Sequence, residues 1–181
     1  EPSPDPRPEP RGLLLLSFLG GMAIVMVVLP IEKFAYTQLQ EGVLLITVWS
    51  AIEEIAKYGA AYFIALKTRF LDEPIDYVIY MITVALGFAA LENTLFLINT
   101  IEKSGLAEGL ATQNLRFIGA SLLHVVSSAS IGIAKALSYY KGWFMRKKHE
   151  KEEKKLLNLF VPPDLLKKWI NNEIFKQEEI I

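Results

Sequence analysis

Long apolar runs dominate the first 140 residues and are interrupted by charges at only a few positions. The runs cover residues 12–31, 42–66, 75–99 and 114–140. A helix needs about 20 apolar residues to cross the roughly 30 Å hydrocarbon core of a bilayer. The pattern therefore predicts an all-α, polytopic membrane bundle of about four transmembrane helices over residues 12–140.

The two ends of the chain have a different character. Residues 1–11 read EPSPDPRPEPR, a charged and proline-rich composition that predicts an extended, disordered segment. Residues 141–181 are charged, and we expect a short amphipathic helix after Asp164, which can cap it. The chain is thus expected to consist of a short N-terminal segment, a membrane domain and a basic tail with a short helix.

Basic residues at the ends of the spans predict the orientation. The tail has four basic residues and no acid between Lys141 and Lys148, and such segments stay in the cytoplasm. With four crossings, both termini are expected to be cytoplasmic, in the plasma (inner) membrane. Loops 32–41 and 100–113 are then expected outside, and loop 67–74 inside.

Composition excludes several classes of function. The formal net charge of −1 gives no reason to expect a nucleic-acid partner. The sequence has no cysteine, which excludes disulfides, thiolate metal sites and a cysteine nucleophile within these residues. It has two histidines, too few for a three-histidine zinc site.

The apolar spans nevertheless carry ionisable residues, at positions Glu53, Glu54, Lys57, Glu92 and His124. A charge in the bilayer core costs at least about 2.5–3.5 kcal/mol on insertion scales, so such residues face the protein interior or a water-filled cavity. At about 1.5 Å per residue, Glu53, Glu92 and His124 of three successive helices lie roughly 10–16 Å below the outer ends. This common depth predicts one shared site.

The residue types at this depth suit the activation of water. Lys57 follows the two glutamates by three and four positions, so it can neutralise one and leave the other as a general base. His124 can act as acid or base, or bind a metal. Asn93 and Arg116 offer donors for an oxyanion. These are the components of a hydrolase.

Three motifs resemble those of the PrsW-type intramembrane proteases. Glu53-Glu-Ile-Ala-Lys57 resembles the EExxK motif, and Gly87-Phe-Ala-Ala-Leu-Glu92-Asn93-Thr-Leu-Phe96 resembles GFxxxENxxF/Y. Arg116 followed by His124 and Gly132 resembles the third motif. The resemblance covers about residues 45–138, in the family's order.

The resemblance implies a peptidase related to the CAAX-protease and bacteriocin-processing superfamily. By position, Glu53, Glu54, Glu92 and His124 would be catalytic, with Asn93, Arg116 and Lys57 in support. The resemblance also implies that the site can bind a divalent metal such as zinc, with Glu53, Glu92 and His124 as the ligands. The implied substrate is a single-span membrane protein, such as an anti-sigma factor. Members usually have a further span with a second histidine, which does not follow Tyr140 here.

Other interpretations remain open from the sequence. The chain can be an inactive relative that binds client helices, or a proton-coupled transporter, since buried carboxyl groups serve there too. Glu53 and Lys57 can be an intrahelical ion pair with no role in a reaction. A run of small residues fits close helix packing, namely Ser127, Ser128, Ser130 and Gly132.

Overall fold

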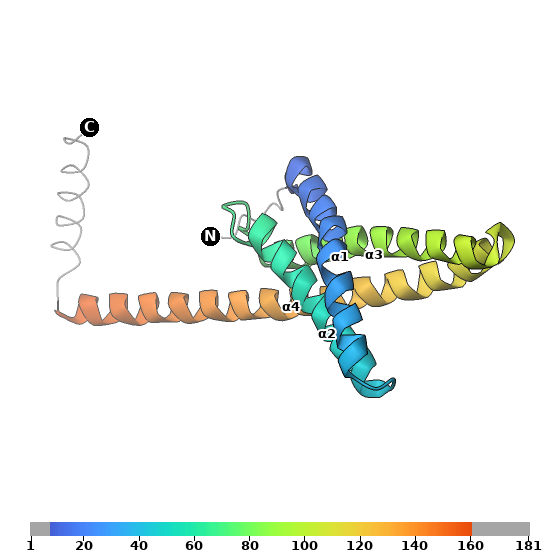
Figure 1. Cartoon of the computed structure of the whole chain (residues 1–181). Coiled ribbons are helices and arrows are strands. Elements are labelled where there is room, and N and C mark those ends of the chain that lie inside the picture. The colour runs from blue at the N-terminus through green and yellow to red at the C-terminus, as the bar shows by residue number, and fades with distance from the viewer. Residues whose placement is uncertain (1–7, 161–181) are drawn as a thin grey trace. The chain divides into compact units, whose positions relative to one another are not determined.

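The structure is a computed structural model, and it describes residues 8–160. Within this range it describes no side chain at residues 108, 112–116, 154 and 156–160. The elements are α1 (Arg11–Gln38), α2 (Val43–Ala61), a π-helical turn η1 (Tyr62–Leu66), α3 (Pro74–Ser104) and α4 (Leu106–Phe160) (Figure 1). The described range contains no strand, so the all-α prediction is confirmed.

The helices run further than the apolar spans. α1 continues from Ile31 to Gln38, and α3 and α4 are separated by Gly105 alone. The expected loops 32–41 and 100–113 are therefore wrong for most of their length. No glycine or proline interrupts 32–38, and the turn after α3 falls at Gly105, whose φ of +85° favours glycine.

Three helical segments in the described range are long and apolar enough to cross a membrane: Arg11–Gln38, Pro74–Ser104 and Phe117–Glu153. This makes the chain an integral membrane protein. α2 falls outside that group because Glu53, Glu54 and Lys57 lie within its 19 residues.

Glu9 accepts a hydrogen bond from the Tyr80 hydroxyl of α3, and α1 begins at Arg11. The expected disorder of residues 1–11 stays a prediction, and residues 1–7 lie outside the described range. The tail is helical as far as Phe160, and the helix expected after Asp164 also lies outside that range.

The chain divides into two compact units after Ser138, and the site lies in the first. In that unit α1 crosses α3 at two glycines, Gly21 of α1 and Gly87 of α3. A Cβ on Gly21 would overlap the backbone of Val84, and a Cβ on Gly87 would overlap the backbone of Phe18. Small residues at such crossings let helix backbones touch. Apolar clusters flank the crossing: Tyr80, Met81 and Val84 with Ala61, Ala65 and Leu66, and Val25, Val28 and Phe88.

The first part of α4 lies antiparallel to α3 (Figure 1). Near the α3–α4 turn, a Cβ on Gly109 would meet Ile101. Further along, a Cβ on Gly132 would lie 2.8 Å from the Cα of Val78. Because the two helices run in opposite directions between these contacts, residues near 124 on α4 face residues near 90 on α3.

We predict that Gly87→Ala destabilises the protein, because the added methyl group forces α1 and α3 apart. Overpacking typically costs about 1–3 kcal/mol, so the unfolding midpoint in detergent should fall. Gly119→Ala is the matched control, since its Cβ would meet nothing within 4 Å. Equal midpoints for the two variants would contradict a backbone contact at the crossing.

Candidate active site

A cavity of about 520 Å³ opens in the first unit where four helices meet. Its wall takes residues from all of them: Glu32 of α1; Ile46, Trp49, Ser50, Glu53 and Glu54 of α2; Glu92 of α3; and Ala120, Leu123, His124 and Ser127 of α4. The four residues expected to be catalytic thus line one cavity.

The Lys57 side chain is fully buried and joins three of these residues. Its Nζ lies 2.6 Å from Glu54 Oε1, 2.8 Å from His124 Nδ1 and 3.5 Å from Glu53 Oε2. It also lies 4.6 Å from the centre of the Phe88 ring, within range of a cation–π interaction. Lys57 is therefore the centre of the network, to which the helices α2, α3 and α4 all contribute.

These contacts define the protonation of His124. An ammonium group donates hydrogen bonds and accepts none, so Nδ1 of His124 is the acceptor from Lys57. The ring proton is then on Nε2, which lies 2.9 Å from Glu92 Oε2 and donates to it. His124 is thus a neutral imidazole whose orientation is fixed from two sides.

The two adjacent glutamates are held very differently. Glu54 accepts hydrogen bonds from Lys57, from Ser127 Oγ at 2.7 Å and from Ser128 Oγ at 2.8 Å. The Oε2 atom of Glu53 has only longer contacts, 3.5 Å to Lys57 and 3.4 Å to His124 Nδ1. Glu54 ties α2 to α4, whereas Glu53 is held more loosely at the cavity wall.

Of the two expected oxyanion donors, the structure describes the side chain of Asn93 alone. Asn93 is buried, and its amide nitrogen donates to Ser121 Oγ at 3.2 Å across the α3–α4 contact. Arg116 belongs to α4, and its side chain lies outside the described part of the chain.

Glu32 also lines the cavity, a placement that the apolar pattern of the sequence does not predict. The uncharged run ends at Ile31, and an outer loop is expected to begin at residue 32. Instead, α1 continues and brings Glu32 into the cavity. Its carboxyl group is hydrogen-bonded to that of Glu53. The unbroken helical composition of residues 32–38 was the signal that could have identified it.

The donor types in the cavity suit a divalent metal, since carboxylate oxygens and imidazole nitrogens are ordinary zinc ligands. Their arrangement does not fit one. Both ring nitrogens of His124 are engaged, by Lys57 and by Glu92. Among the described side chains, no group of three or more His, Asp or Glu is placed to hold a metal ion, so the expected set of Glu53, Glu92 and His124 is not assembled.

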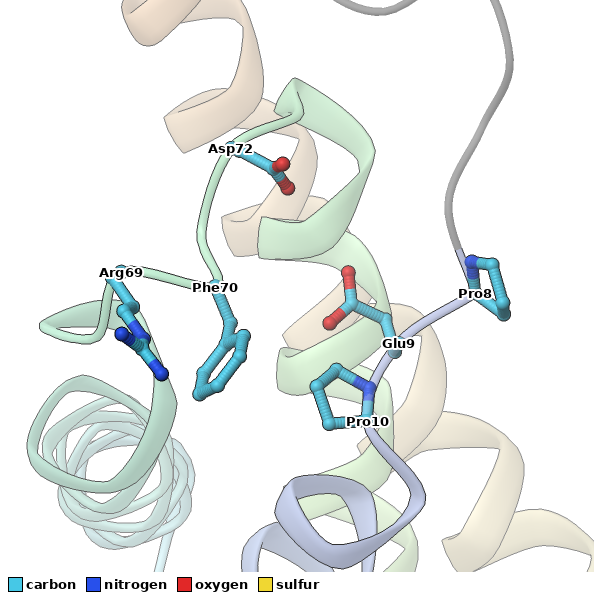
Figure 2. Close-up of a pocket in the computed structure, with 6 residues that line it drawn as sticks. All are labelled: Pro8, Glu9, Pro10, Arg69, Phe70 and Asp72. Atoms are coloured by element: carbon cyan, nitrogen blue, oxygen red, sulfur yellow. The ribbon is translucent and has the colours of Figure 1, made fainter.

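A separate cavity of about 400 Å³ lies where α1 begins (Figure 2). Residues 8–10 form one side, and Arg69, Phe70 and Asp72 of the segment before α3 form the other. The Arg69 guanidinium lies 5.2 Å from the Phe70 ring centre. This cavity has no histidine in its wall and shares no residue with the four-helix cavity.

Comparison with known proteins agrees with this geometry. Residues 9–162 match the family described as "PrsW family intramembrane metalloprotease", which is most of the chain. The chain belongs to the PrsW family. The matched range contains every residue that lines the four-helix cavity.

Two curated relatives carry the name Protease PrsW. The one from Geobacillus kaustophilus is 33% identical over 146 residues, which is 77% of this chain and 58% of the relative. The one from Halalkalibacterium halodurans is 36% identical over 112 residues, 61% of this chain and 45% of the relative. The chain thus spans about half the length of these PrsW proteases. No solved structure matches it.

We predict that Lys57→Met strongly destabilises this PrsW-family chain, because it leaves the partly buried Glu54 without its cation. Breaking a buried ion pair in this way typically costs about 3–5 kcal/mol, measurable as a lower unfolding midpoint in detergent. The double variant Lys57→Met/Glu54→Gln should recover part of the loss. Lys103→Met, at an exposed lysine, is the control. Similar midpoints for Lys57→Met and Lys103→Met would contradict the central role of Lys57.

Proposed function

We propose that this chain carries the catalytic centre of an intramembrane endopeptidase that hydrolyses peptide bonds of single-span membrane proteins, such as an anti-sigma factor. Membership of the PrsW family supports the reaction class. The cavity supports it independently, because it combines a loosely held carboxylate, an oriented imidazole and a buried ammonium group.

We propose that α2 is a fourth crossing and that both termini are cytoplasmic. The charges of α2 do not oppose this, because they face the protein interior. The Lys57 side chain is 0% exposed, and those of Glu53 and Glu54 are 19% and 18% exposed. Paired charges that face a bundle interior are the kind that membrane helices tolerate.

Glu53 is the general base in the proposed mechanism. It takes a proton from a water molecule as the water oxygen bonds to the carbonyl carbon of the peptide. His124, whose Nε2–H donates to Glu92 and whose Nδ1 accepts from Lys57, is held at the cavity wall beside Glu53. When the C–N bond breaks, Glu53 returns the proton to the leaving amine, so atoms and charges balance.

One observation favours Glu53 over Glu54 as the base. Glu54 accepts three hydrogen bonds of 2.6–2.8 Å, and a carboxylate engaged in this way is a poor proton acceptor. Glu53 keeps a carboxylate at the cavity wall without such short contacts to Lys57 or His124. Glu92 orients His124 through Nε2, and Lys57 supports both Glu53 and His124.

We expect Glu53→Gln to remove cleavage of a single-span substrate in liposomes and to leave the unfolding midpoint unchanged. Loss of a general base lowers the rate by about 10²–10⁴-fold. Glu54→Gln should instead lower the unfolding midpoint, because it weakens the tie between α2 and α4. Glu102→Gln, at an exposed position, is the control for both measurements.

The reverse outcome, with cleavage lost at unchanged stability only in Glu54→Gln, would make Glu54 the base. An unaltered wild-type protein that cleaves no membrane substrate would reject the endopeptidase proposal, and the binding of client helices would become the better interpretation.

The proposed topology predicts which single cysteines a membrane-impermeant thiol reagent can reach in this cysteine-free chain. Gln40→Cys should react in intact cells, whereas Lys67→Cys and Lys148→Cys should react only after the membrane is opened. Reaction of Gln40→Cys and Lys67→Cys from the same side would show that α2 does not cross.

A further inference from the structure

Glu32 is the one acidic residue of the cavity wall that comes from α1. It belongs to none of the three sequence motifs, which lie on α2, α3 and α4. Its carboxyl group is hydrogen-bonded to that of Glu53, the proposed base, at the wall of the same cavity. The position calls for an explanation, because a second acid beside a base repels it when both are ionised.

The backbone of Glu32 is fixed to α2 and not merely adjacent to it. The indole nitrogen of Trp49 donates a hydrogen bond of 3.1 Å to the Glu32 carbonyl oxygen. One helical turn further on, the Tyr36 ring stacks on the Trp49 ring with centroids 6.2 Å apart. Since Trp49 precedes Glu53 by one turn of α2, these contacts hold the Glu32 side chain at a defined place beside Glu53.

The contact between the two carboxyl groups requires a proton. Two carboxyl groups form a hydrogen bond only when one of them is protonated. The Oε1 atom of Glu32 is buried and has no hydrogen-bond partner among the described groups, which is unfavourable for an ionised carboxylate. Glu53 Oε2 already lies 3.5 Å from the Lys57 ammonium group, which donates to it. Glu32 is therefore the donor and Glu53 the acceptor.

We infer that Glu32 is a positioning residue of the active site, whose carboxyl group donates a hydrogen bond to Glu53 and holds that base at the cavity wall. This inference rests on the proposed function. It gives α1 a part in the reaction, because Glu32 adds a hydrogen bond from α1 to the contact that Lys57 of α2 makes with Glu53.

The test compares Glu32→Ala with Glu32→Gln in the liposome cleavage assay. Glu32→Ala removes the donor, and we expect kcat to fall by about 10- to 100-fold while KM changes by less than about threefold. Glu32→Gln keeps an N–H donor of similar reach, so it should restore kcat to within about threefold of the wild type. Unfolding midpoints should match in all three proteins. Glu102→Ala is the control, an exposed glutamate outside the cavity wall.

Three results would overturn the inference. Wild-type kcat in Glu32→Ala would show that Glu53 needs no such support. Equal losses in Glu32→Ala and Glu32→Gln would show that hydrogen-bond donation is not what matters. A lowered unfolding midpoint that accounts for the loss of activity in both variants would assign Glu32 to folding alone.

A second measurement does not depend on activity. In the cysteine-free chain, the pair Glu32→Cys/Glu53→Cys should be joined by a short bifunctional thiol reagent more readily than Glu32→Cys/Glu54→Cys, because Glu54 is directed to Ser127 and Ser128. Equal yields would overturn the inference. Cross-linking of the first pair, together with no substrate cleavage by the unaltered protein, would reject the proposed function and with it the role of Glu32 in the reaction, while the contact with Glu53 would stand.

Discussion

The ammonium group of Lys57 is the interaction on which the rest of the site depends. It is fully buried and lies within 3.5 Å of two carboxylates and one imidazole nitrogen, so it neutralises charges that the membrane domain could not otherwise hold. Because a donor-only group faces Nδ1, it also selects the tautomer of His124. One lysine therefore links the stability of the bundle to the protonation of the residues in its cavity.

This network can form only if the helix backbones approach closely. The glycines at the crossing of α1 and α3 let the two backbones touch, and Gly132 does the same for α3 and α4. Larger residues at these points would force the helix backbones apart, and hydrogen bonds between side chains of different helices weaken as their donors and acceptors separate. The small residues far from the cavity are thus part of what defines its geometry.

Much of the site could be predicted from the sequence, because membrane helices restrict where charges can lie. The common depth of Glu53, Glu92 and His124 follows from the helical rise and the span ends, and the structure brings these three side chains to one cavity. The side to which each residue is directed could not be predicted. Whether Asn93 donates to the cavity or to Ser121, and whether Glu54 or Glu53 takes the serine hydroxyls, depends on helix rotation, which a spacing pattern leaves open. Helix ends were misplaced for a related reason: residues 32–38 continue the helix beyond the apolar run, and that extension is what carries Glu32.

Because of this packing, the two adjacent glutamates, Glu53 and Glu54, form different contacts. Consecutive residues on a helix project about 100° apart, so Glu53 and Glu54 meet different neighbours although they are identical in type. Glu54 is hydrogen-bonded to the serines of α4 and becomes a structural anchor, whereas Glu53 lies at the cavity wall near Lys57, His124 and the carboxyl group of Glu32. A base in a membrane cavity must be charged enough to take a proton and held firmly enough to meet a water molecule at one position. Separate neighbours for the two carboxylates let one residue bear the structural contacts while the other remains available for the reaction.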